Sequence, residues 1–258
     1  MPLTESVISP AALYFCLDQV QTPFTKLNCL AITTITIPGF LDPHRSGPAV
    51  DVSILPTGWL FLPDSWIFTD GKPSLKHWSP DFSFLIRHPS GKSVLFDLRM
   101  RKVSQVHSAE YPIIAPHVPK DVYDLLIEGP VHPEDIDVVI LSHLHFDHTG
   151  DVTRFPSAEI LVGAGSEATT TPGWPKAEFS PFDGTVLSHP KFRELPSSGT
   201  GFAPLGPFPK SYEVIVSSVG GLGSSIYLLA GMYGSCHGGE NNRDDLELHI
   251  EYRVGLFN

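Results

Sequence analysis

Three histidines and one aspartate lie within six residues, in the segment HLHFDH at 143–148. The segment directly follows VVIL at 138–141, an apolar run that predicts a strand buried on both faces. In layered proteins that combine helices and sheets, ligand sites occur where buried strands end in polar, titratable residues. The cluster therefore predicts a layered fold with a ligand site at one end of a sheet.

The spacing within the cluster indicates a metal site. His143 and His145 are two residues apart, so in extended backbone both imidazoles point the same way and can reach one ion. If the chain turns into a helix near 149–152, Asp147 and His148 point toward a second position nearby. Nitrogen ligands combined with a carboxylate suit zinc best, with manganese or iron as alternatives. A polar loop with chance histidines is disfavoured, because the pattern follows an apolar strand directly.

Other segments predict the elements around the cluster. FSFLIRHPSGKSVLFDL (82–98) predicts a hairpin, and KDVYDLLIEG (120–129) predicts a helix with an apolar stripe. Further strands are predicted at LAITTITI (30–37), VSIL (52–55), WLFL (59–62), EILVG (159–163), YEVIVSSV (212–219), SSIYLLA (224–230) and LELHIEYRV (246–254), whereas 169–209 is expected to be mostly loop.

The segment SHLHFDHTGD resembles the H-x-H-x-D-H signature of the metallo-β-lactamase superfamily. VLFDL resembles the hairpin strand that ends in an aspartate in this family, and Asp97 is that residue. The resemblance covers 82–166 well and 167–258 loosely, within a single expected domain of 1–258. It implies an α+β fold, an αββα sandwich of two mixed sheets flanked by helices. The surroundings of the motif resemble lactonases, glyoxalase-like hydrolases and fungal lactamase-like proteins.

The resemblance also implies an activity and a set of ligands. The chain is expected to be a metal-dependent hydrolase that opens a small lactam, lactone, ester or thioester. His143 and His145 would bind one Zn²⁺ ion, and Asp147 and His148 a second, as in intact relatives with two ions. A metal-activated water would attack the carbonyl carbon, and Asp147 is the expected catalytic residue because it would also pass a proton to the leaving group.

The second half of the chain departs from the family pattern. Relatives complete the site with a histidine, often within PGHxxGH, then a bridging aspartate and a last histidine. Here YLLAGMYGSCHGG (227–239) lacks both histidines of that motif, and His237 is out of register. Asp244 and Asp245 fit solvated loop charges better than a bridging ligand, and His249 falls on the polar face of an alternating strand.

We therefore expect a second half that is truncated or diverged, or an altered reading of a longer gene. The alternative function is a catalytically impaired or non-catalytic remnant of the fold, which lacks the C-terminal ligands. An iron oxygenase of the persulfide dioxygenase kind is a third reading, which needs a further ligand. Arg99 follows FDL at a position where relatives commonly have glycine, so a loop that needs positive φ there would be strained.

The charge of the chain restricts its partners. Asp and Glu number 28 against 17 Lys and Arg, for a formal net charge of -11, which disfavours nucleic acid. We expect a small-molecule substrate and make no prediction of oligomeric state. No basic start precedes an apolar run at the N-terminus, and no apolar run approaches the ~20 residues of a membrane span. The expected location is cytoplasmic, without a membrane partner.

Overall fold

The computed structural model describes residues 25–26, 50–68, 70–102, 115–205, 208–216, 225–234 and 248–257. Strands β1 (Thr25–Lys26), β10 (Ser225–Gly234) and β11 (Leu248–Phe257) are described by their backbone pairing. The strand predicted at 30–37 lies outside the described residues, as do His237, Asp244 and Asp245.

Among the described residues, the larger sheet has seven strands in sequence order, β1-β2-β3-β4-β5-β6-β7. Its strands after β1 are β2 (Asp51–Pro63), β3 (Lys76–Arg87), β4 (Ser93–Phe96), β5 (Val138–Ile140), β6 (Glu159–Val162) and β7 (Phe192–Glu194). Pairing is antiparallel from β1 to β4 and parallel from β4 to β7, so the sheet is mixed. The hairpin predicted at 82–98 is confirmed as β3 and β4, and the strands predicted at 138–141 and 159–163 as β5 and β6.

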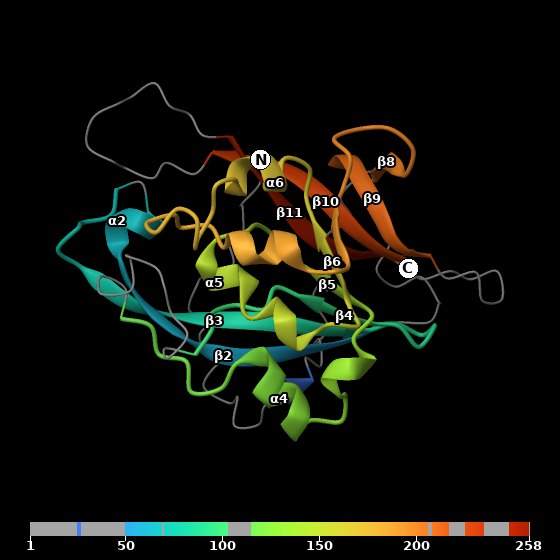
Figure 1. Ribbon diagram of the computed structural model, residues 1–258, viewed down its shortest axis with the longest axis horizontal. Coiled ribbons are helices and arrows are strands. Elements are labelled where there is room, and N and C mark those ends of the chain that lie inside the picture. Colours follow the sequence, from blue (N-terminus) through green and yellow to red (C-terminus); the bar gives the residue numbers. More distant parts are fainter. Residues whose placement is uncertain are drawn as a thin grey trace, which may run out of the picture.

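The smaller sheet has four strands in the order β11-β10-β9-β8, all antiparallel. It contains β8 (Phe202–Leu205) and β9 (Phe208–Val216) beside the two C-terminal strands. Figure 1 shows this sheet, in orange and red, beside the larger one. Ile215 of β9 is buried in one apolar cluster with Val94 and Leu161 of the larger sheet, so the two sheets pack against each other. The predicted α+β sandwich is confirmed.

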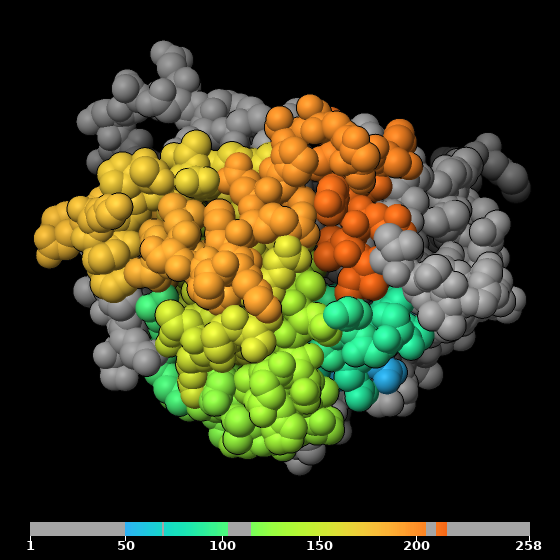
Figure 2. Space-filling view, turned by 45° about the vertical axis from the view of Figure 1, so that its right-hand side comes forward, coloured from blue at the N-terminus to red at the C-terminus, as the bar shows by residue number. Residues whose placement is uncertain are grey.

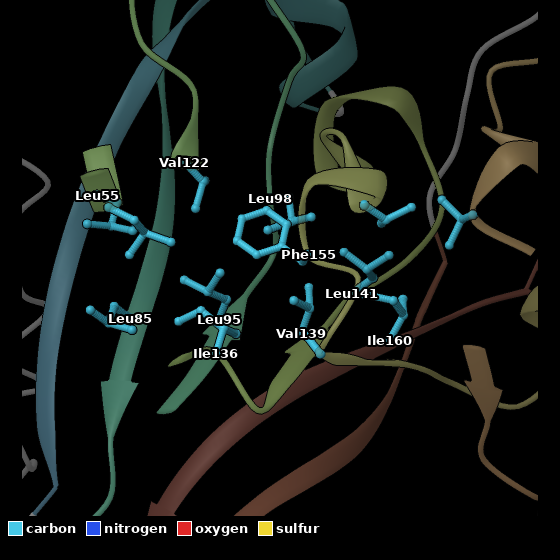
Figure 3. Close-up of a cluster of buried hydrophobic side chains, with 14 of the residues drawn as sticks. Leu55, Leu85, Leu95, Leu98, Val122, Ile136, Val139, Leu141, Phe155 and Ile160 are labelled. Atoms are coloured by element: carbon cyan, nitrogen blue, oxygen red, sulfur yellow. The ribbon is translucent and has the colours of Figure 1, made fainter. Parts of the chain in front are cut away.

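Side chains of the central strands alternate between two apolar layers, because successive residues of a strand point to opposite faces. Val94 and Leu161 face the smaller sheet. Leu95, Val139 and Ile160 face the opposite side, where they pack with α4 and with Phe155 (Figure 3). This two-sided burial explains why these strands read as continuous apolar runs in the sequence.

The helices are short. α4 (Val122–Glu128) begins at a capping box formed by Asp121 and Asp124 and buries Val122, Leu125 and Leu126, so the predicted apolar stripe is confirmed. The other helices are α2 (Asp64–Ile67), η2 (Pro133–Asp135), α5 (Phe146–Thr149), η3 (Val152–Arg154), α6 (Ser166–Thr170) and η4 (Gly184–Ser188). In the part of the chain that the structure describes, no helix has the length and apolar character needed to cross a membrane.

The prediction of two short strands at 52–55 and 59–62 is wrong. A single strand, β2, runs through Pro56-Thr57-Gly58, with a shift of register against β3 between Pro56 and Gly58. A β-bulge of this kind absorbs an extra residue without ending the strand. The Thr57 hydroxyl donates to the buried carbonyl of Asp81 at 2.9 Å, which holds the two strands together at the bulge.

The stretch predicted to be mostly loop, 169–209, contains short elements as well: the end of α6, then η4, β7, β8 and the first residues of β9. Figure 2 shows it, in yellow and orange, spread over a large part of one face of the molecule. Part of this stretch contacts the histidine cluster.

Candidate metal centre

The histidine cluster lies at the carboxyl end of β5, beside the end of β4. The two strands are parallel, with Phe96 opposite Ile140, so the residues that follow them emerge at the same edge of the sheet. Asp97 follows β4, and the cluster begins just after β5. The helical turn is α5, which begins at Phe146 and so comes earlier than the turn predicted at 149–152. Asp147 and His148 therefore lie on a helix, and His143 and His145 on the extended segment before it.

Three of the four predicted ligands converge. The possible ligand atoms of His143, His145 and Asp147 all lie within 4.8 Å of one another, and each residue is half-buried. It is the one group of three or more such side chains found among the described residues. The Nε2 atom of His143 and the Nδ1 atom of His145 are 3.1 Å apart, so the two rings direct nitrogen atoms to the same point.

The fourth predicted ligand, His148, lies beside this group. Its Nε2 atom is 3.6 Å from Asp147 Oδ2, and its Nδ1 atom is 2.8 Å from Asp97 Oδ2. Its ring centroid is 4.0 Å from that of His143. Burial alone would lower the pKa of His148, but the carboxylates of Asp147 and Asp97 raise that pKa to about 8 because they favour the charged imidazolium.

Asp97 is the buried anion beneath the cluster, with 1% of its surface exposed. It accepts hydrogen bonds from the Ser142 amide at 2.7 Å and the Ser142 hydroxyl at 2.9 Å. Burial alone would raise its pKa, but His148, Arg99 and the Ser142 amide together lower it. Asp97 is therefore a carboxylate that fixes the ring of His148 and the start of the cluster.

Asp81 is a residue of this site that sequence reasoning missed. It lies on β3 opposite the β2 bulge, with 5% of its surface exposed. Its Oδ2 atom has no hydrogen-bond partner among the described residues. Burial, with a smaller contribution from the Asp147 carboxylate, raises the pKa of Asp81 to about 7, although the Arg99 guanidinium opposes the shift. One signal was available, since Asp81 and Ser83 are polar residues that share one face of the strand with the apolar Leu85, and all three are buried.

Arg99 has the positive φ that was expected to strain it. Its φ is 61°, a conformation that costs a residue other than glycine about 1–2 kcal/mol. What the sequence did not reveal is that its side chain reaches the site. Nη1 lies 3.1 Å from His148 Nδ1 and 3.6 Å from Asp97 Oδ2, and Nε lies 3.3 Å from Asp81 Oδ1. Nε also donates to the carbonyl of Phe82.

The backbone after β4 is held tightly against the end of α5. The amides of Leu98 and Arg99 both donate to the carbonyl of His148, at 2.8 and 3.1 Å. The Gly150 amide donates back to the Arg99 carbonyl at 2.6 Å. A Cβ atom on Gly150, whose φ is 48°, would lie 2.5 Å from Leu98 Cβ. Only glycine fits this close approach.

A loop from the second half of the chain holds the other side of the cluster. The ring of Phe182 stacks on that of His145 with centroids 4.7 Å apart. The Phe146 amide donates to the Pro181 carbonyl at 3.1 Å, and the Asp183 amide to the Leu144 carbonyl at 3.1 Å. Arg101 reaches the Asp183 carboxylate at 2.5 Å. These contacts hold the loop around Phe182 against the ring of His145.

The C-terminal candidates of the sequence analysis are not placed at the site. His249 lies on β11, where its backbone is opposite Tyr233 of β10, and its side chain is outside the described part of the structure. His237, Asp244 and Asp245 lie outside the described residues altogether. The contribution of the second half, as far as it is described, is the loop around Phe182.

The family model of the metallo-beta-lactamase superfamily matches residues 79–224. A curated metallo-hydrolase, mfmC of Annulohypoxylon moriforme, is 34% identical over 172 residues, which cover 60% of this chain and 43% of the relative. Gamma-lactamase FDB1 of Fusarium pseudograminearum is 32% identical over 142 residues, 49% of this chain and 34% of the relative. The chain thus spans less than half the length of either relative.

Solved structures show the same fold at lower identity. An N-acyl homoserine lactone hydrolase with the product N-hexanoyl-L-homoserine at its metal centre matches with a TM-score of 0.50 and 16% identity, over 71% of each chain. A quorum-quenching N-acyl homoserine lactone hydrolase matches with a TM-score of 0.50 and 19% identity, over 71% of this chain and 69% of the other. At these identities the likeness shows the fold alone.

The contact at Gly150 predicts a strong effect on stability. Gly150→Ala should lower the free energy of unfolding by about 2–4 kcal/mol. The added Cβ would clash with Leu98, and alanine would also be strained by the positive φ. Gly91 is the matched control, since its φ is 89° and a Cβ there meets nothing within 4 Å. Gly91→Ala should cost only about 1 kcal/mol. Equal losses for the two variants in urea unfolding would contradict the close approach of the two segments.

Proposed function

The chain belongs to the metallo-beta-lactamase superfamily, and on that basis we propose that it is a metal-dependent hydrolase that opens a small lactam or lactone ring. Members of this superfamily bind a divalent metal. The observation that carries the proposal is the convergence of His143, His145 and Asp147 at the end of a buried strand. Two imidazoles and one carboxylate are a common set of three protein ligands for a catalytic metal.

The geometry of the group fits a zinc ion. Two nitrogen atoms bound to one tetrahedral Zn²⁺ lie about 3.3 Å apart, given Zn–N bonds of about 2.0–2.1 Å, and the nitrogen atoms of His143 and His145 are 3.1 Å apart. We propose Zn²⁺ as the metal, held by His143, His145 and Asp147. His148 turns its Nε2 toward Asp147, so we place it at the edge of the centre, where intact relatives are expected to hold a second ion.

The residues around the group supply orientation and proton transfer. When bound, the metal polarises a carbonyl group and lowers the pKa of a coordinated water to about 7. Phe182 and Asp97 hold the rings of His145 and His148 in place, which keeps donor atoms directed at one point. We propose that Asp147, half-buried in the first turn of α5, also takes a proton from the attacking water and passes it to the leaving group.

The substrate class is a proposal from the relatives and from charge. Curated relatives include a gamma-lactamase and the N-acyl homoserine lactonase AttM of Agrobacterium fabrum, which is 34% identical over 98 residues, 35% of this chain and 37% of the relative. We therefore rank lactams and lactones ahead of thioesters. The net charge of -11 argues against nucleic acid. A single domain over 1–258 and a cytoplasmic location remain predictions.

A catalytically impaired remnant of the fold is the second candidate. The observation that favours it is Arg99, which takes a position typical of glycine with φ of 61° and directs its guanidinium into the site. The two candidates differ in whether the purified protein turns over a cyclic amide or ester.

Metal retention tests the ligand assignment. The purified, dialysed protein should keep about one Zn²⁺ ion per chain, because three firm protein ligands hold it. His145→Ala should weaken Zn²⁺ binding by more than about 100-fold, since it removes a direct ligand. His132→Ala is the matched control: His132 is exposed, and we expect unchanged zinc content by elemental analysis. Equal zinc content in both variants would refute the assignment.

Hydrolysis tests the activity itself. The zinc-loaded protein should open a γ-lactam or an N-acyl homoserine lactone faster than a linear thioester. Asp147→Asn should lower that rate by at least about 100-fold, whereas Asp70→Asn, in an exposed turn, should leave it unchanged. A protein that retains zinc but opens none of these substrates is the remnant and not the hydrolase.

A further inference from the structure

We propose that the positive charge of the Arg99 guanidinium replaces that of a second metal ion and keeps such an ion out, so that this centre holds one ion per chain. This inference rests on the proposed metal centre, beside which Arg99 supplies a permanent positive charge. It is carried by the contacts of Arg99 with the acids and the imidazole beside the position where a second ion is expected.

Arg99 lies on the Nδ1 side of His148, one imidazole ring away from the position between His148 Nε2 and Asp147 where a second ion would bind. Its side chain is 15% exposed and contacts two carboxylates, with Nε 3.3 Å from Asp81 Oδ1 and Nη1 3.6 Å from Asp97 Oδ2. Nη1 is also 3.1 Å from the ring of His148. A guanidinium is always charged and presents several donors in a fixed plane, so it neutralises these acids without an ion.

The three carboxylates of the site fall into two groups, one beside Arg99 and one beside the histidines. Asp81 and Asp97 both lie in ion pairs with Arg99, and Asp147 lies with His143 and His145 in the group of three. One divalent ion satisfies that group. A second divalent ion beside His148 would lie one imidazole ring away from the guanidinium in a partly buried site, where like charges repel strongly.

His148 is engaged on the side that faces Arg99. Its Nδ1 lies 2.8 Å from Asp97 and 3.2 Å from the Ser142 hydroxyl, so Asp97, Arg99 and His148 form one network. In the described part of the chain, His148 does not belong to the group of three ligands. The network therefore fixes the ring of His148 with Nε2 toward Asp147 and holds the guanidinium against the other ring nitrogen.

The backbone holds Arg99 in place despite its cost. A residue keeps a sparsely populated backbone conformation only when several contacts with its surroundings hold it there. The Arg99 amide donates to the His148 carbonyl at 3.1 Å, and its carbonyl accepts from the Gly150 amide at 2.6 Å. Arg99 is thus held both by the hydrogen bonds of its backbone and by the ion pairs of its guanidinium. Without its charge, Asp147 Oδ2 and His148 Nε2, which are 3.6 Å apart, could both bind a second ion, and Asp81 would lose its ion pair.

The number of bound ions tests the proposal. Metal-free protein is titrated with Co²⁺, followed by visible absorption, and zinc content is measured independently by elemental analysis after dialysis. The unchanged chain should saturate at about one ion, and Arg99→Gly at about two, since glycine removes the charge and adopts the positive φ freely. Arg99→Asn should also reach about two, because asparagine tolerates this conformation without a charge.

Arg99→Lys is the matched control, which keeps the charge and should stay at about one ion. Thermal unfolding of each variant establishes that it is folded. Two ions in the unchanged chain, or one ion in the folded Arg99→Gly and Arg99→Asn variants, would overturn the role of Arg99 while leaving the metal centre intact. No ion in any variant would overturn the proposed function and this inference with it.

Discussion

The hydrogen bonds accepted by the Asp97 carboxylate are the interaction on which the candidate centre depends. Asp97 follows directly after β4, and its partners Ser142 and His148 follow the neighbouring parallel strand β5. One buried carboxylate thus ties together the two chain segments that build the site. Removing one partner from a buried charged network of this kind costs about 3–5 kcal/mol, so the apolar packing of the strands and the geometry of the histidines are coupled.

The rest of the site is arranged around this anchor in two charged halves. On one side, His143, His145 and Asp147 direct their donor atoms to one point, with Phe182 stacked on His145. On the other, Arg99 lies among acids that the sheet buries. The two halves meet at His148, between Asp147 and Asp97. The sheet thus supplies the rigid strand ends, and the segments that follow β4 and β5 supply the side chains of the cluster.

Local sequence patterns predicted many strands and one helix correctly, because the apolar positions in those segments are the ones that the folded structure buries. The strand at 138–141 is apolar on both faces since it lies between two layers, and the helix at 120–129 shows its buried stripe directly. β2 was misread because Pro56-Thr57-Gly58 reads locally as a turn, whereas pairing with β3 keeps the strand continuous. The sequence predicted which residues gather near one point. It did not predict Asp81 or the guanidinium of Arg99, whose contacts arise only when β3 and β4 lie beside α5.

X-ray absorption at the zinc edge of the purified protein reports the atoms around the metal, so it tests whether His143, His145 and Asp147 hold a single zinc ion. We expect nitrogen and oxygen neighbours at about 2.0–2.2 Å, with the scattering pattern of two imidazole rings and no sulfur. We also expect no metal neighbour at about 3.5–4 Å, the separation found in two-metal sites. A shell containing sulfur, a shell without two imidazoles, or a metal neighbour at that distance would show that these three residues do not form a centre with one zinc ion.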